Sequence, residues 1–193
     1  MAVDSNNVFV GVPDQATTGA ILSAPYGTAL PTTVVATPNV AFVDSGYVDE
    51  DGVTLTPDKS TTSIKDWSRA EIRRVLDEFT AEIAWVHLEL SEEALNNYFG
   101  EDNVTVTAPT VSTGTRIEAV LNSADLPEKS WIFNVKDGDK RIRIVVPRGQ
   151  VSSQGEIKFV ANDAVKLPVT LACLPDASGN SVYLYTDDGI FSA

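Results

Sequence analysis

The stretch KSTTSIKDWSRAEIRRVLDEFTAEIAWVHLELSEEALNNYFG, residues 59–100, decides the fold of this chain. It is the longest patterned run in the sequence, and no proline interrupts it. One interpretation is a helix, because Ser68 followed by Glu71 forms a capping box and apolar residues then recur at helical spacing. The other is a pair of strands, because polar and apolar side chains also alternate between Glu71 and Leu90. The two interpretations predict different folds and therefore different functions.

The chain is long and apolar enough for one large domain or for a domain with extended arms. It has 193 residues, of which 43% are hydrophobic and 21% charged, a balance typical of globular proteins. Residues 1–40 contain four prolines, which interrupt helices and central strands. We therefore expect residues 1–40 to be an extended N-terminal arm and residues 41–193 to be a single β-rich domain.

The chain is strongly acidic, with 14 Lys and Arg against 27 Asp and Glu and a net charge of −13. A protein that grips nucleic acid neutralises phosphates with clustered basic side chains. The densest basic group here, Lys140, Arg141 and Arg143, lies next to Asp137 and Asp139. The sequence therefore disfavours direct binding of nucleic acid. An acidic surface serves solubility in most proteins, and it also repels DNA where a protein lines a passage that DNA crosses.

The sequence gives no indication of a membrane segment or of a disulfide. No run of about 18 apolar residues is present, and the N-terminal residues lack the basic and apolar regions of a secretory signal. Cys173 is the only cysteine, which excludes an internal disulfide and a cysteine metal cluster. We expect a protein that makes no membrane contact and is synthesised in a reducing compartment.

The residue types needed for catalysis do not form a recognisable pattern. His87 is the only histidine, and no serine has the GxSxG setting of a hydrolase nucleophile. Cys173 stands in the apolar run LPVTLACLP and is predicted to be buried and unreactive. The phosphate-binding glycine motifs are missing, and the acidic turn at residues 49–52 lacks the spacing of a calcium loop. We expect no catalytic residue, no cofactor and no metal site.

The three tryptophans, Trp67, Trp85 and Trp131, leave a second class of function open. Aromatic faces stack on sugar rings, so exposed tryptophans would favour a carbohydrate-binding or adhesin β-sandwich. Tryptophans in cores and interfaces are the commoner case. A hydrolase is a third class, and it would need His87 in a cleft beside a nucleophile.

The remaining segments are mostly strands. Residues 91–100 are predicted to be a short helix that Ser91 caps and Gly100 ends. Residues 41–57 are predicted to form a hairpin around the acidic turn. A second hairpin is predicted from Trp131 to Val146, with an Asp-Gly turn. Further strands are expected at residues 104–108, 116–121, 157–161, 168–174 and 181–186.

Strands at this spacing, with turn signals between them, are typical of a sandwich or a barrel. The single helix spans only a few turns and needs a sheet to pack on. We therefore expect a mainly β fold in which two antiparallel sheets pack together as a sandwich or partial barrel, with one short flanking helix.

Three segments resemble the major tail proteins of siphophages, in particular those of phages that infect actinobacteria. They are GAILSAPYGTALP at residues 19–31, GYVDEDGVTLTPDKSTTSIKDW at residues 46–67, and YFGEDNVTV at residues 98–106. The resemblance implies a tail tube protein whose homo-hexameric rings stack around a tape-measure protein. DNA would later pass through this tube without specific binding. Tail terminator and distal tail proteins would be further partners, and the tail would be assembled in the host cytoplasm and remain in the virion.

The resemblance also implies strands, not a helix, in the opening stretch, and we expect no helix longer than three turns between Arg69 and Leu90. One face of these strands would line the tube. The lumen-facing candidates are Glu71, Arg73, Asp77 and Glu82. The segment before them would connect subunits or rings, with Asp49, Glu50, Asp51 and Lys59 as candidate residues.

Overall fold

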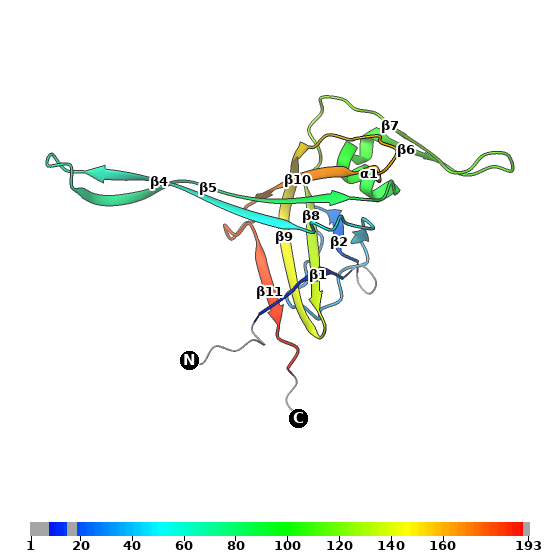
Figure 1. Cartoon of the computed structure of the whole chain (residues 1–193). Coiled ribbons are helices and arrows are strands. Elements are labelled where there is room, and N and C mark those ends of the chain that lie inside the picture. The colour runs from blue at the N-terminus through cyan, green and yellow to red at the C-terminus, as the bar shows by residue number, and fades with distance from the viewer. Residues whose placement is uncertain (1–7, 15–18, 191–193) are drawn as a thin grey trace.

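The computed structural model describes residues 8–14 and 19–190, and within them the chain is mainly β with one short helix (Figure 1). This confirms the predicted fold class. In chain order the elements are β1 (Val12–Pro13), β2 (Ile21–Pro25), β3 (Val43–Asp44), β4 (Thr54–Lys65), β5 (Glu71–His87), α1 (Glu92–Phe99), a 3-10 turn (Glu101–Asn103), β6 (Val104–Thr107), β7 (Arg116–Ala119), β8 (Lys129–Asp137), β9 (Lys140–Gln154), β10 (Leu167–Leu174) and β11 (Tyr183–Asp187).

Among the described residues, nine strands form one large antiparallel sheet, and β6 and β7 form a small second sheet. The large sheet has the order β3-β2-β8-β9-β10-β5-β4, with β1 beside β8 and β11 beside β9. Strand β9 pairs first with β11 and then, from Arg148 onward, with β10. Strands β5 and β10 run across β8 and β9 (Figure 1), so the sheet folds around an interior as in a partial barrel.

The interior is filled by aromatic and branched side chains from several strands. The ring centroid of Trp85 lies 5.3 Å from that of Trp131 and 5.3 Å from that of Phe133. Ile83 and Leu171 are fully buried in the same cluster. Burying a large apolar side chain contributes about 1.5–3 kcal/mol, so this cluster holds the two parts of the folded sheet together.

Helix α1 covers this interior and follows the prediction at both ends. The Ser91 hydroxyl accepts a hydrogen bond from the backbone N–H of Ala94 at 3.3 Å, and Tyr98 is buried against the core. Gly100 ends the helix with a φ of 94°. A Cβ there would also lie 2.8 Å from Leu126, so both the backbone and the packing require glycine.

The opening stretch is a strand, and the helical interpretation of it is wrong. Residues 71–87 form β5 without interruption, so no helix lies between Arg69 and Leu90. The Ser68 hydroxyl donates to the Asp66 carboxylate at 2.6 Å and makes no helix cap. Burial explains the outcome, because alternate side chains of β5 from Ala81 to His87 enter the core.

Residues 19–40, which belong to the expected N-terminal arm, contact the large sheet. Strand β2 pairs with β8 inside the large sheet, and Ile21 is fully buried. Farther along, Leu30 and Phe42 pack on the opposite face of that sheet. The buried Arg143 guanidinium donates to the carbonyls of Thr33, at 3.0 Å, and Ala36, at 2.6 Å. The prolines limit strand length, but the apolar residues between them still join the core. The parts of the expected arm at residues 1–7 and 15–18 lie outside the described residues.

The hairpin predictions had different outcomes. The β8–β9 hairpin is confirmed, with Trp131 opposite Val146 and Phe133 opposite Ile144. Residues 41–57 do not pair with one another as expected: β3 pairs with β2, Val48 forms a bridge to His87, and β4 pairs with β5. The strand predicted at residues 157–161 is irregular chain. These errors arise because alternation alone does not identify the partner of a strand.

Lys129 is a buried cation that joins β8 to helix α1. Its side-chain nitrogen lies 2.6 Å from Glu101, 3.4 Å from Glu93 and 3.2 Å from the amide oxygen of Asn97. The Lys129 side chain is only 5% exposed. A buried charge is tolerated where partners of this kind surround it.

We predict that Lys129→Met lowers the free energy of unfolding by about 3 kcal/mol, because Glu93 and Asn97 lose a buried partner. Lys158→Met is the matched control, since Lys158 pairs with Glu156 at the surface, and it should change the stability by less than about 1 kcal/mol. Urea unfolding followed by tryptophan fluorescence measures both. Equal effects of the two substitutions would contradict the role assigned to Lys129.

Candidate assembly interface

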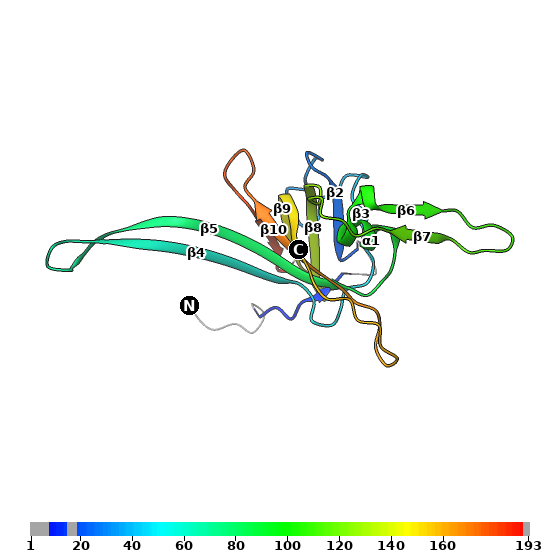
Figure 2. The same ribbon diagram turned by 90° about the horizontal axis from the view of Figure 1, so that it is seen from above.

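Strands β4 and β5 extend beyond the body of the protein as a two-stranded arm (Figures 1 and 2). Strand β10 pairs with β5 only from Glu82 to His87, and the rest of β5 pairs with β4 alone. Nearly every side chain in residues 54–80, which we call the arm, is exposed. Beyond Ala81 the arm is roughly 30 Å long at the usual rise of a strand. A two-stranded hairpin is only marginally stable in water, so the arm is suited to packing on a partner.

Two register shifts change which side chains share a face of the arm. The pairs Ser60–Glu78 and Thr61–Leu76 leave Asp77 as an extra residue on β5. A second shift follows, between the pairs Ile64–Arg73 and Lys65–Glu71. Each extra residue reverses the alternation of side chains on β5 relative to the core face.

The four predicted lumen residues therefore do not share one face. Arg73 lies opposite Ile64 and Glu71 lies opposite Lys65, and these neighbours on β4 point to opposite sides. Glu71 instead pairs with Arg74 at 3.1 Å. Arg73, Asp77 and Glu82 lie on the face turned away from the core, where the Thr62 hydroxyl donates to the Asp77 carboxylate. Simple alternation along the sequence predicts that Glu71 and Arg73 share a face. The structure differs because the sequence pattern does not reveal the two bulges.

The end of the arm is an ordered turn that presents Trp67 to solvent. The Asp66 carboxylate accepts hydrogen bonds from the Ser68 hydroxyl at 2.6 Å and from the Ala70 N–H at 2.9 Å. These bonds lower the pKa of Asp66. Arg69 has a φ of 68°, a backbone conformation that is unfavourable for a side chain of this kind. Trp67 makes no contact that reduces its exposure, which is 103%.

The predicted connector residues occupy two separate places. The Asp49 carboxylate forms an ion pair with Lys166 at 3.1 Å. The Asp49 backbone carbonyl closes a turn by accepting a hydrogen bond from the Gly52 N–H at 2.9 Å. Glu50 and Asp51 are exposed on that turn, at the base of the arm. Lys59 lies farther out, 5.8 Å from the ring centroid of Phe79. The turn at residues 49–52 is thus joined to the loop at residues 155–166 by the Asp49–Lys166 ion pair, whereas Lys59 belongs to the arm.

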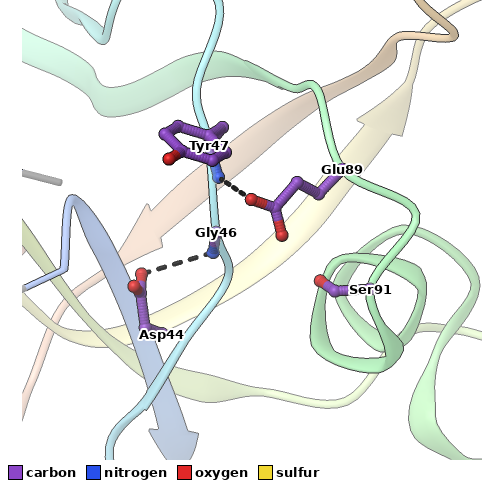
Figure 3. Close-up of a pocket in the computed structure, with 5 residues that line it drawn as sticks. All are labelled: Asp44, Gly46, Tyr47, Glu89 and Ser91. Carbon is purple, nitrogen blue, oxygen red and sulfur yellow. Dashed lines mark hydrogen bonds between the residues drawn. The ribbon is translucent and has the colours of Figure 1, made fainter. Parts of the chain in front are cut away.

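A polar pocket of about 360 Å³ lies beside the start of α1 (Figure 3). Glu89 accepts a hydrogen bond from the Tyr47 N–H at 3.2 Å, and Asp44 accepts one from the Gly46 N–H at 3.3 Å. Burial, with a smaller contribution from the charge of Glu89, raises the pKa of Asp44. Both carboxylates accept hydrogen bonds from the backbone between β3 and β4. The polar residues of the pocket therefore hold this segment in place.

The residues considered for catalysis and sugar binding are mostly buried. His87 has no exposed surface, and its Nε2 accepts a hydrogen bond from the Trp85 indole at 2.8 Å. Cys173 is buried, as predicted, and this burial raises the pKa of its thiol to about 12. Trp85 and Trp131 are core residues, so they cannot form a sugar platform with Trp67. Within the described residues, no three His, Cys, Asp or Glu side chains are placed to hold a metal ion.

Comparison with family models gives a match to the phage tail tube protein model over residues 1–192. The chain belongs to the phage tail tube protein family. This confirms the resemblance seen in the sequence and makes the chain a structural component of the phage tail, present in the virion. The exposed arm is consistent with a protein that functions in an assembly. A comparison with curated protein sequences finds no match.

Among solved structures, the tail tube protein is similar to the tube-terminating cap of the anti-feeding prophage, with 11% identity, a TM-score of 0.46 and coverage of 97% of this chain and 100% of that one. A chain of the native gene transfer agent virion has 10% identity and a TM-score of 0.41, covering 87% and 95%. A chain of the PVC sheath–tube complex, from an extracellular contractile injection system, has 7% identity and a TM-score of 0.39, covering 87% and 89%. No helix in the described part of the chain is long and apolar enough to span a membrane.

We predict that His87 makes the protein less stable in acid. Burial lowers its pKa from 6.5 to about 4, so only the unfolded chain takes up this proton between pH 6.5 and 4. The free energy of unfolding should fall by about 3 kcal/mol across this window. His87→Gln keeps an acceptor for Trp85 and cannot titrate. Unfolding in urea at pH 7, 6 and 5 should therefore show a shallower pH dependence for His87→Gln, and parallel curves would contradict the assignment.

Proposed function

We propose that six copies of this tail tube protein form a ring and that the rings stack into the tube through which DNA leaves the virion. The observation that carries the proposal is the arm, which extends from the body with almost every side chain exposed. An arm of this kind becomes stable when another copy covers it. A tape-measure protein inside the tube, and terminator and distal tail proteins at its ends, complete the proposed set of partners.

Free strand edges support closure between copies. Strand β4 pairs with β5 on one side, and β11 pairs with β9 on one side. Their other edges have no strand partner among the described residues. Exposed edges promote uncontrolled association in a monomer, whereas a closed ring satisfies every edge. A ring therefore accounts for an edge as long as β4, which has 12 residues.

The acidic composition supports passage of DNA. A net charge of −13 gives the assembled tube a field that repels phosphate, so DNA can slide without being held. For the lumen we propose the face of β5 that carries Asp77 on the arm and Glu82 at its base, because this face points away from the core. Glu71 lies on the opposite face and is not part of this lumen surface.

We predict that the purified protein forms six-fold rings or hollow tubes in electron micrographs. Deleting residues 57–80 and joining the cut ends with a short turn should leave a folded body that does not assemble, because the core begins at Ala81. Tubes formed by the shortened chain would contradict the role of the arm. A wild-type protein that stays monomeric and binds saccharides would overturn the tube function in favour of an adhesin.

We predict that Asp77→Lys combined with Glu82→Lys slows DNA ejection, because positive charges in the lumen attract phosphate. Assembly should persist, since both side chains are exposed. Glu156→Lys is the control: it reverses the charge of an exposed side chain outside the arm and should leave the ejection rate unchanged. Dye-monitored ejection from virions measures both. Equal rates for the double variant and the wild type would exclude this face as the lumen.

A further inference from the structure

The end of the arm carries a net positive charge although the whole protein is acidic, and it shares this character with the turn of the β8–β9 hairpin. Residues 64–74, which we call the arm tip, contain four basic and two acidic side chains, in a chain whose net charge is −13. The first 58 residues of the chain contain no Lys or Arg at all. The arm tip is thus a basic surface on an acidic molecule. Its basic residues are Lys65, Arg69, Arg73 and Arg74.

The arm tip also has the apolar surface and the order of a docking element. Trp67, Ile64 and Ile72 are exposed, by 103%, 49% and 67%. Tryptophan and arginine are the residues most enriched among those that dominate binding energy. The hydrogen bonds of Asp66 and the positive φ of Arg69 define the backbone of the turn that carries Trp67. Strain at an exposed turn is typical of a functional site.

The opposite end of the molecule has the complementary character. Helix α1 and the β6–β7 hairpin lie on the side away from the arm in both views (Figures 1 and 2). Asp102, Glu118 and Asp125 are exposed there, and none of them forms an ion pair with another described residue. Hydrogen bonds from Val120 and Asn122 to Asn103 hold this region together, at 2.9 and 2.6 Å. We call this surface the acidic end.

The acidic end also offers apolar contact for a tryptophan. Val120 and Leu121, which directly follow β7, are exposed by 50% and 69%. In contrast, Glu93 and Glu101 are neutralised by Lys129, and Glu128 pairs with Arg148 at 2.7 Å. The free negative charge is carried by Asp102, Glu118 and Asp125, against one exposed basic side chain, Arg116 on β7, and it lies next to an exposed apolar group.

We propose that the arm tip of one copy docks on the acidic end of the next copy, with Trp67 against the apolar group and Arg69 and Arg73 facing Asp102 and Glu118. The inference rests on the proposed assembly into rings and names the surfaces that join neighbours. Two different surfaces at opposite ends make a head-to-tail contact, which closes into a ring when the rotation permits. An exposed, charged contact of this kind is weakened by salt.

The test uses two full-length variants with opposite defects. The tip variant carries Arg69→Glu and Arg73→Glu, and the end variant carries Asp102→Lys and Glu118→Lys. Each variant alone should need about tenfold more subunit to assemble, because like charges then meet at the contact. An equal mixture should assemble as well as the wild type, since each tip meets the opposite charge on the other variant. Sedimentation velocity and electron microscopy measure assembly.

Controls separate this inference from folding and from the tube function. All four positions are exposed, so both variants should melt like the wild type, and Lys158→Glu, outside both surfaces, should assemble normally. Normal assembly of either variant alone, or a mixture that does not recover, would overturn the docking contact while leaving the tube function intact. A wild type that forms no ring or tube would overturn the tube function itself.

Discussion

The structure depends on how β5 is held. Alternate side chains from Ala81 to His87 enter the core, and the six residues from Glu82 to His87, which pair with β10, attach the whole strand to the body. Trp85 is the centre of this attachment, because it contacts Trp131, Phe133 and His87. The buried half is rigid enough to direct the exposed half. The arm is therefore an extension of a core strand, and its direction is fixed by core packing.

A divided strand has a thermodynamic consequence. The buried half gains the hydrophobic stabilisation of the core, whereas the exposed half has cross-strand pairs alone, each worth about 0.2–1 kcal/mol. Such an arm gains little stability from the rest of its own chain. In the proposed assembly, the contact energy would therefore lie in the part of the protein that contributes least to folding.

The body and the arm tip differ in net charge. The acidic residues lie mostly on the body, whereas the basic residues lie on the arm tip, on the β8–β9 hairpin and in pairs such as Arg148 with Glu128. Lys129 and Arg143 are exceptions that serve the core, since each is buried and bound by several acceptors or carboxylates.

The sequence by itself determined the fold class, the short helix from Glu92 to Phe99 with its cap at Ser91, the β8–β9 hairpin and the family, because these depend on local pattern and on ordered motifs. The tertiary structure decided whether residues 71–87 form a helix or a strand, since both patterns fit the sequence and burial of alternate residues selected one. It also decided the partners of β2, β3 and β4 and the bulge at Asp77, which separates Glu71 from Arg73. Pairing between distant strands and the place of a bulge depend on packing across the whole sheet, and local alternation does not contain that information.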